Sequence, residues 1–250
     1  MRFEERLKEK FLYSKGKNFF KSIYFIIQKL KKNKHRKISY SGGAIDLIIE
    51  HYFRNKAKGI YIDVGAYHPV MGNNTFKLFN KGWSGINIDL DFHTIDILNN
   101  FRPNDENIIA AVSDKIEKKK LYFHHNRSAI NTLEKSKGGK SKEIREVTTN
   151  TLNNIIENSK YKDLEIDFIS IDVEGHEMKV VKGFDLEKYS PKIVVIEHQD
   201  LDMKKEEFHN QNIEKIIKSN IYNHMISRNY ALVNWLHADL VFINKNLQDS

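Results

Sequence analysis

Three short apolar runs of this chain end in acidic residues, and these acids are the side chains best placed for chemistry. The runs occupy residues 60–64, 85–90 and 168–172, and their acids are Asp63, Asp89 and Asp172. Their β-branched residues are typical of buried strands. Because open α/β sheets bind ligands beyond the carboxyl ends of their strands, the pattern predicts a polar ligand site at one edge of a sheet.

The glycine after the first run and the acid of the second have the spacing of a nucleotide-binding unit. Gly65 allows the chain to turn tightly or a ligand to approach the backbone. Asp89 follows it by 24 residues, close to the offset of about 20 at which such units place the acid that binds a ribose. The sequence therefore predicts a nucleotide or nucleoside cofactor. The alternative is that these acids only cap helices behind core strands.

The loop after Gly65 lacks the further glycines of a dinucleotide site. Tyr67 and Pro69 stand where the backbone would have to approach a pyrophosphate, and proline has no amide hydrogen to donate. A cofactor without phosphates, such as S-adenosylmethionine, needs no such cradle. An oxidoreductase of the NAD type remains an alternative.

The composition is that of one globular domain preceded by a basic arm. The 250 residues are 40% hydrophobic and include no cysteine, which excludes disulfides, thiolate metal sites and a cysteine nucleophile. Residues 1–38 hold 13 Lys and Arg against 3 acids, and the other 212 residues hold 28 against 30. The net charge of +8 thus belongs to the arm, so we expect no nucleic-acid partner. A nucleic-acid-binding or nucleic-acid-modifying protein that uses the arm remains a second alternative.

Apolar residues at helical spacing predict an amphipathic helix in the arm, namely Phe19, Ile23, Ile26, Ile27 and Leu30. Lysines and arginines follow from residue 29, as in helices that lie on anionic membranes. The longest apolar run, 23–27, is far shorter than the roughly 18–20 residues of a membrane span. We therefore expect a cytoplasmic protein with peripheral contact at the inner membrane face, or an arm helix packed on the domain or on a second subunit.

Strand and helix patterns alternate along residues 39–250, which we predict to form one domain. Strands are expected at 60–64, 85–89, 107–112, 121–124, 168–172, 193–197, 230–235 and 240–244. Helices are expected at 41–53, 73–80, 94–101, from 149 or 151, at 174–183 and at 212–228. This alternation predicts an α/β, doubly wound, mainly parallel sheet with a C-terminal antiparallel hairpin. A flexible insert is expected near 124–147, because its segment 135–142 has no apolar residue and two central glycines.

These segments resemble the FkbM-type S-adenosylmethionine-dependent methyltransferases over residues 59–200. The matching motifs are DVGA at 63–66, the acid Asp89, AVSD at 111–114, TL at 151–152, IDVEGHE at 171–177 with Gly183 after it, and PKIVVIEH at 191–198. The resemblance implies a class I methyltransferase (Rossmann-like) fold and S-adenosylmethionine as cofactor. It also implies methylation of a sugar hydroxyl in surface glycan or polysaccharide biosynthesis, with a carbohydrate or sugar nucleotide as substrate. The chain departs from the family at Pro69, where a glycine is usual, and at Asp89, where a glutamate is usual.

The resemblance places the cofactor against the first three strands. Asp89 is expected to accept the ribose hydroxyls, Ser113 or Asp114 to read the adenine, and Asp63 to orient the loop or a water. The full predicted cofactor set is Asp63, Gly65, Ala66, Asn74, Thr75, Asp89, Ser113, Asp114 and Asp172.

Methyl transfer to an alcohol needs alignment of the reacting atoms and a base for the alcohol's proton. We expect the catalytic groups after the strands at 168–172 and 193–197, namely His198, Asp172, Glu174 and Glu197. His198 is the expected base because its unperturbed pKa lies near neutrality. Asp172 and Glu174 are alternatively ligands of Mg²⁺ or acids that stabilise a helix N-terminus. His176 is expected to be structural or to face solvent.

Overall fold

The computed structural model describes residues 6, 19, 21–24, 26, 37–198, 212–236 and 238–247. The chain divides into two compact units, Met1–Ile38 and Ser39–Ser250. In the first unit the described residues between 19 and 26 are helical, and the side chains of Phe19, Ile23 and Ile26 are exposed. The predicted helix positions Ile27 and Leu30 lie outside the described residues. Among the residues described, no helix has the length and apolar character needed to cross a bilayer.

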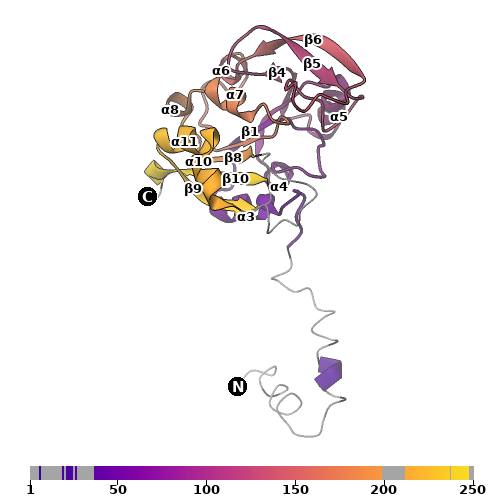
Figure 1. Ribbon diagram of the computed structural model, residues 1–250. Helices are drawn as coiled ribbons and strands as arrows, with labels where there is room; N and C mark the ends of the chain where they lie inside the picture. The colour runs from indigo at the N-terminus through magenta and orange to yellow at the C-terminus, as the bar shows by residue number, and fades with distance from the viewer. Residues whose placement is uncertain are drawn as a thin grey trace. The chain divides into compact units, whose positions relative to one another are not determined.

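Two sheets organise the second unit (Figure 1). A seven-stranded sheet has the order β3-β2-β1-β7-β8-β10-β9, and a three-stranded sheet has the order β4-β6-β5. The strands are β1 Ile60–Val64, β2 Ser84–Asp89, β3 Glu106–Ile109, β4 Ala111–Val112, β5 Lys118–Phe123, β6 Glu143–Asn150, β7 Phe168–Ile171, β8 Ile193–Glu197, β9 Tyr230–Leu236 and β10 Asp239–Asn244.

All strands of the large sheet are parallel to one another except β10, which lies second from one edge. Strand β1 lies between β2 and β7, with Ile62 opposite Ile86 and Ile169, and all of these pairings are parallel. Strand β10 is antiparallel to both β8 and β9. This arrangement confirms the predicted doubly wound sheet of the class I methyltransferase type with its C-terminal antiparallel hairpin.

Helices connect and cover the strands. They are α3 Ile45–Tyr52, α4 Phe76–Asn80, α5 Phe92–Phe101, α6 Leu152–Glu157, α7 Glu177–Lys182, α8 Leu186–Tyr189, α10 Ile213–Lys218, α11 Asn220–Ser227 and the 3₁₀ turn η2 Lys245–Leu247. Several begin at a side chain that accepts hydrogen bonds from first-turn amides, as Asp91 does for α5 and Thr151 for α6. These side chains mark where those helices start, whereas α3, α4 and α7 have no such side-chain cap.

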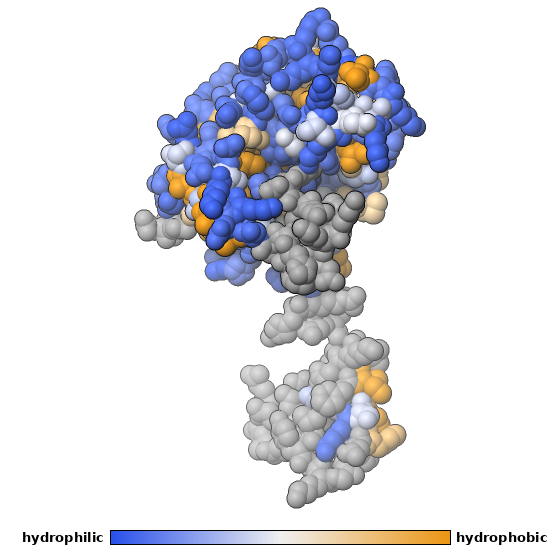
Figure 2. All heavy atoms as spheres, in the orientation of Figure 1, coloured by the Kyte–Doolittle hydropathy of each residue, from blue (hydrophilic) through white to orange (hydrophobic). Residues whose placement is uncertain are grey.

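The core lies on both faces of the large sheet because successive side chains of a strand point to opposite faces. On β1, Ile62 and Val64 pack in a cluster with residues of α6, α7, α8, α10 and α11. Tyr61, which precedes Ile62 and so points to the opposite face, packs instead with residues of α3 and α4. The described surface in the view of Figure 2 is mainly hydrophilic, with apolar residues in separate patches.

Several predicted elements differ from the structure. The helix predicted at 41–53 begins only at Ile45, and the one predicted at 73–80 begins at Phe76. The helix predicted at 174–183 begins only at Glu177, because Glu174 and Gly175 have left-handed backbone angles, φ 57° and 96°. The helix predicted at 212–228 is two helices, because the Ser219 hydroxyl accepts from the Tyr222 amide and starts α11. The strand predicted at 107–112 is split between the two sheets as β3 and β4. Residues 143–147, predicted as part of the insert, belong to β6, which pairs with β5.

Candidate active site

A pocket of about 800 Å³, open to solvent, lies beyond the carboxyl ends of β1, β2 and β7. Acids line it together with apolar residues, and no Lys or Arg is among its described lining residues. The lining residues are Val64, Gly65, Tyr67, Gly72, Ile88, Asp89, Leu90, 110–112, Ser128, Ala129, 131–133, Asp172, Val173, Glu174 and His176.

Gly65 brings the ends of β1 and β7 into direct contact below the pocket. Its φ is 85°, and a Cβ at this position would lie 1.7 Å from the carbonyl oxygen of Asp172. Any side chain here would therefore displace the segment that presents Asp172. The glycine is required by the close approach of two backbone segments.

Asp89 is the last residue of β2, and each of its carboxylate oxygens accepts a hydrogen bond from one backbone amide. One oxygen accepts from the Tyr67 amide at 3.0 Å and the other from the Asp91 amide at 2.8 Å. Each oxygen keeps a second acceptor position. Burial raises the pKa of Asp89 to about 6, although the two amide hydrogen bonds act to lower it. The carboxylate is thus held in place and can accept two further hydrogen bonds, as a ribose diol requires.

Asp63 lies outside the pocket lining and organises the loop after β1. It accepts from Asn73 Nδ2 at 3.0 Å and Thr75 Oγ1 at 2.8 Å. The fully buried Arg102 donates to the carbonyl of Pro69, to Asn73 and to Thr75. The predicted role in orienting the loop therefore has a structural basis in a buried network around one arginine.

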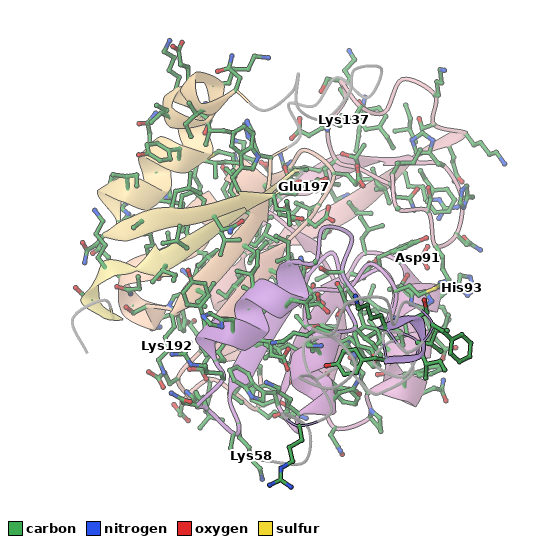
Figure 3. The ribbon with its side chains drawn as sticks, turned by 90° about the horizontal axis from the view of Figure 1, so that it is seen from below. Lys58, Asp91, His93, Lys137, Lys192 and Glu197 are labelled. Carbon is green, nitrogen blue, oxygen red and sulfur yellow. The ribbon has the colours of Figure 1, made fainter. Side chains whose placement is uncertain are left out.

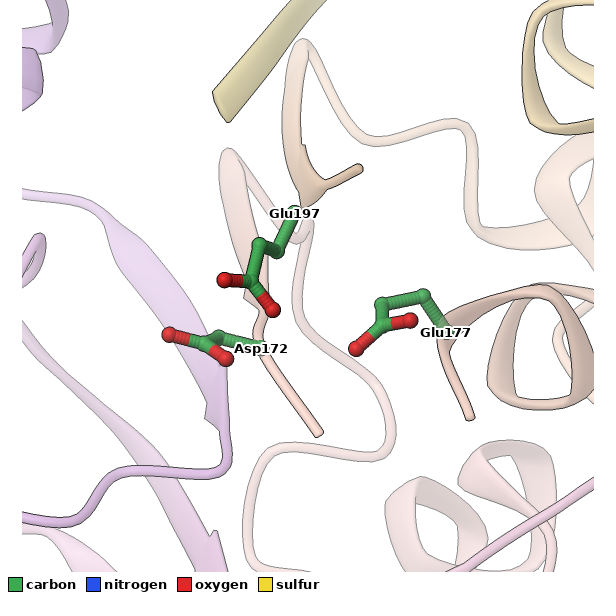
Figure 4. Close-up of side chains that lie close together, drawn as sticks. All are labelled: Asp172, Glu177 and Glu197. Carbon is green, nitrogen blue, oxygen red and sulfur yellow. The ribbon is translucent and has the colours of Figure 1, made fainter. Parts of the chain in front are cut away.

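Three carboxylates face one another, one directly after β7, one at the start of α7 and one at the end of β8 (Figure 4). Oxygens of Asp172, Glu177 and Glu197 all lie within 4.8 Å of each other. Burial in the recess and the nearby charges of Glu197 and Glu174 raise the pKa of Asp172 well above its usual range. Because the Asp172 side chain is exposed to the open pocket, we attribute the rise chiefly to the neighbouring carboxylates. Like charges this close favour sharing of a proton.

Glu177 acts as an anchor within this group. Its Oε1 accepts from the amides of Gly175 at 2.8 Å and Val173 at 3.1 Å, which fixes the loop before α7. Burial raises the pKa of Glu177. The group has oxygen ligands of the kind that Mg²⁺ prefers, but acids without a further sign of an ion do not establish a metal site. A Mg²⁺ site at Asp172 and Glu174 stays a prediction.

The adenine-reading groups expected at 113–114 are engaged elsewhere. The Ser113 amide donates to the Asn150 carbonyl at 2.8 Å, and the Ser113 hydroxyl lies 2.9 Å from His176 Nε2. Asp114 forms an ion pair with Lys179 at 3.2 Å. Neither residue lines the pocket. Their expected contact with adenine stays a prediction, and the structure shows them as partners of other protein groups.

The pocket brings together Gly65, Asp89, Asp172 and Glu174 from the predicted site. Ala66 packs instead on Ile95 and Leu98, and Asn74 donates to Ser170. Glu197 ends β8 beside Asp172, and His198 follows it with its amide bonded to the Ala238 carbonyl at 2.6 Å. The residues that do not line the pocket are Asp63, Ala66, Asn74, Thr75, Ser113, Asp114, Glu197 and His198.

Several pocket residues were missed from the sequence. His176 lines the pocket and is buried, so of its two expected roles, structural or solvent-facing, the structural one fits its hydrogen bonds. Other pocket residues come from the insert between β5 and β6, namely Ser128, Ala129 and 131–133. The lysine-rich part of this insert, 135–142, lies outside the family resemblance. The one available signal was the pair of polar residues Asn131-Thr132, too weak to mark a binding wall.

Comparison with known proteins shows the family of this chain. The methyltransferase FkbM domain model matches residues 63–223, whereas curated protein sequences give no significant match. Among solved structures, monomeric WbdD shares 14% identity over 84% of this chain and 42% of its own, with a TM-score of 0.41. This chain thus spans less than half the length of WbdD. A putative S-adenosyl-L-methionine-dependent methyltransferase from Methanococcus maripaludis shares 13% identity over 85% of this chain and 97% of its own, with a TM-score of 0.39. Since the family model covers well over half of the chain, this protein belongs to the FkbM methyltransferase family.

Proposed function

We propose that the protein transfers a methyl group from S-adenosylmethionine to a sugar hydroxyl during assembly of a surface glycan or polysaccharide. Its family makes it a methyltransferase and implies S-adenosylmethionine as the donor. The observation that supports an oxygen acceptor is Asp172, a carboxylate of raised pKa that opens into the pocket. The sugar is inferred from the resemblance to relatives that act on sugar hydroxyls.

The charge of the pocket suits this cofactor. S-Adenosylmethionine, when bound, supplies a methyl group on a positively charged sulfur. The carboxylates of Asp172 and Glu174 would attract that charge and would repel the phosphates of a dinucleotide. Asp89 would accept the ribose hydroxyls, while Ile88 and Leu90 offer apolar contact beside it. The absence of Lys and Arg from the described lining argues in the same direction.

Asp172 is the residue we assign to proton removal. A base must lie within hydrogen-bond reach of the acceptor hydroxyl, and Asp172 opens into the pocket. Its raised pKa brings its basicity closer to neutral pH, where a base is most effective. His198 follows the neighbouring strand and does not line the pocket, so we keep it as the second choice of base.

Methyl transfer with labelled donor tests this function. The wild-type protein is incubated with S-adenosylmethionine labelled in its methyl group and with a panel of monosaccharides, sugar nucleotides and isolated polysaccharides. We expect label in an ether-linked methyl group of one class of sugar, and a loss of labelling in Asp172→Asn. Asp163→Asn is the matched control, because Asp163 is exposed and does not line the pocket. Label that appears only in amines or carboxylates would contradict an alcohol acceptor.

The same assay decides the metal alternative. If the carboxylates act without an ion, EDTA leaves turnover unchanged. Inhibition by EDTA that Mg²⁺ reverses would instead make Asp172 and Glu174 ligands rather than bases.

We further propose peripheral membrane contact through the basic arm of a cytoplasmic protein. In the arm, Phe19, Ile23 and Ile26 are helical and exposed, as an interfacial helix requires. Full-length protein should sediment with anionic vesicles at low salt and be released as salt rises. Equal sedimentation with neutral vesicles, or none with anionic ones, would refute the contact.

A further inference from the structure

We propose that residues 126–134, here called the strap, form a wall of the methyl-donor site, and that Glu134 and His176 are the positioning residues that hold it there. The inference rests on the proposed function, because it takes the pocket to be the cofactor site. It adds to the family's pocket a segment from the insert between β5 and β6.

The strap is anchored on both sides of the pocket. At its first end the Arg127 amide donates to Asp91 at 2.8 Å, and Asn126 Nδ2 lies 3.1 Å from His93 Nε2. Asp91 caps α5 and His93 lies in its first turn, in the segment that follows the end of β2. At its second end Thr132 Oγ1 donates to the Glu174 carbonyl at 2.9 Å, and Glu134 Oε1 lies 2.5 Å from His176 Nδ1. The strap therefore bridges the ends of β2 and β7.

The pocket-lining part of the strap lies between these anchors. Ser128, Ala129 and 131–133 all line the pocket, as do Asp89 and Asp172 on the two strands that the strap connects. Within the strap, Asn131 Oδ1 accepts from the His124 amide and its Nδ2 donates to the His125 carbonyl, so the turn holds its own shape. A ligand in the pocket would therefore contact a pre-formed wall.

His176 connects the strap to the rest of the site through hydrogen-bond partners on both of its ring nitrogens. It is 2% exposed, and both ring nitrogens have partners, Glu134 on one side and the Ser113 hydroxyl on the other. A neutral imidazole that donates from Nδ1 to Glu134 can accept at Nε2 from the Ser113 hydroxyl, whose one hydrogen is shared between His176 and Asp114 Oδ1 at 3.1 Å. A hydrogen bond to a charged carboxylate is about twice as strong as one between neutral groups. Lys137, three residues after the strap, packs against Gly175 next to His176, because a Cβ on Gly175 would lie 3.1 Å from Lys137 Cε.

Loss of the Glu134 carboxylate should release the second end of the strap without removing a core residue. The Glu134 side chain is 35% exposed, and the strap interior keeps its own hydrogen bonds. Cofactor affinity should therefore fall, and the apo protein should also melt at a somewhat lower temperature, because the buried His176 loses a hydrogen-bond partner. A residue that only stabilises the fold would lower the melting temperature and leave the affinity of the folded protein unchanged.

The test is calorimetric titration of full-length protein with S-adenosylhomocysteine, combined with hydrogen exchange. We expect Glu134→Ala to weaken binding about ten-fold, because binding would then have to order the released end of the strap, and a ten-fold change corresponds to about 1.4 kcal/mol. Glu134→Gln, which keeps an acceptor oxygen, should bind within about three-fold of wild type. In the wild type, S-adenosylhomocysteine should slow amide exchange in residues 126–134, and Glu134→Ala should reduce this protection.

The matched control is Glu143→Ala, which removes an exposed acid of the same insert whose partner is the surface Arg145. It should leave affinity unchanged. If Glu134→Ala proves unstable, Thr132→Val serves in its place. It removes the other hydrogen bond of the second anchor, and we expect it to weaken binding by a smaller factor. If wild type binds S-adenosylhomocysteine with no protection of the strap, or if Glu134→Ala and Thr132→Val both bind as wild type, the inference is wrong and the proposed function stands. If wild type does not bind S-adenosylhomocysteine at all, both are overturned.

Discussion

The two ends of strand β7 hold the same residue type in opposite electrostatic surroundings. Asp167 precedes the strand and Asp172 follows it. The buried Asp167 forms ion pairs with Lys56 and with Lys192 at 2.8 Å, and it accepts from the Ile60 amide at 3.1 Å. No Lys or Arg among the described residues forms an ion pair with Asp172, whose neighbours are Glu197 and Glu174. Figure 3 labels Lys192 before β8 and Glu197 at its end.

This difference suggests separate roles for the two ends of β7: the paired end at Asp167 serves stability, and the pocket end at Asp172 serves function. Although burial alone would lower the pKa of Lys192, its hydrogen bonds to Asp167 and Glu165 raise it, so the paired end favours charged groups. At the other end, like charges raise the pKa of Asp172 and disfavour its ionised form. Groups held at such a cost are characteristic of functional sites.

The largest effect should come from the pocket end. Asp172→Asn should lower turnover at least about 100-fold, because a general base contributes about 10²–10⁴-fold. The affinity for S-adenosylhomocysteine should change only a few-fold, and the free energy of unfolding should stay equal or rise because a like charge is removed. Steady-state kinetics and urea unfolding measure these quantities. If Asp172→Asn lost stability but kept its turnover, Asp172 would serve stability and not catalysis, contrary to the account.

The opposite pattern is expected at the paired end. Asp167→Ala leaves two lysines and the Ile60 amide without their carboxylate, so the free energy of unfolding should fall by about 2–3 kcal/mol. Turnover measured below the unfolding transition should stay near wild type. Chemical denaturation with the unfolding slope checked for two-state behaviour provides the measurement. Normal stability in this variant would show that the pairing contributes little.

The pH dependence of cofactor affinity should reveal Asp89. Its pKa of about 6 in the free protein means that the carboxyl becomes protonated as pH falls through 6. Binding of S-adenosylhomocysteine should therefore weaken about ten-fold between pH 7.5 and pH 5. Because the folded pKa exceeds the unfolded value, the same group lowers stability as pH rises from about 4 to 6. In Asp89→Asn the affinity should be low, and this step should be absent from its pH profile.

The smallest effect should be that of His198→Ala. Since His198 lies outside the pocket lining, we expect turnover to fall by less than about ten-fold, with cofactor affinity unchanged. A loss as large as that of Asp172→Asn would transfer the role of base to His198. The two variants compared in one assay therefore assign the proton acceptor.

The parts of the fold that follow local patterns could be predicted from the sequence. The run IYIDV predicted β1 at its correct bounds, and of the two helix starts expected at Thr149 or Thr151 the structure has Thr151. The start of α7 could not be predicted, because Glu174 adopts a left-handed angle that only the contacts of its loop support. Ser219, a serine between two apolar helical segments, carried a start signal that was overlooked.

The candidate site was predictable where it lies on strand ends and not where it depends on distant segments. Gly65, Asp89 and Asp172 follow their strands directly, so their common edge follows from the parallel order. Arg102 looks like a surface residue after a helix, yet it is fully buried and holds the loop of Asn73 and Thr75. No local pattern indicates such a contact, nor the pairing of Glu134 with His176 across 42 residues.

The central claim is that the carboxyl end of the sheet binds the nucleoside of a methyl donor through Asp89. Calorimetric titration of S-adenosylhomocysteine into wild type, Asp89→Ala and Asp96→Ala tests it directly, with Asp96 as an exposed acid of α5 outside the pocket lining. We predict binding to wild type and to Asp96→Ala with equal affinity, and at least about ten-fold weaker binding to Asp89→Ala. Unchanged affinity in Asp89→Ala, or binding of NADH in place of S-adenosylhomocysteine by the wild type, would contradict the account.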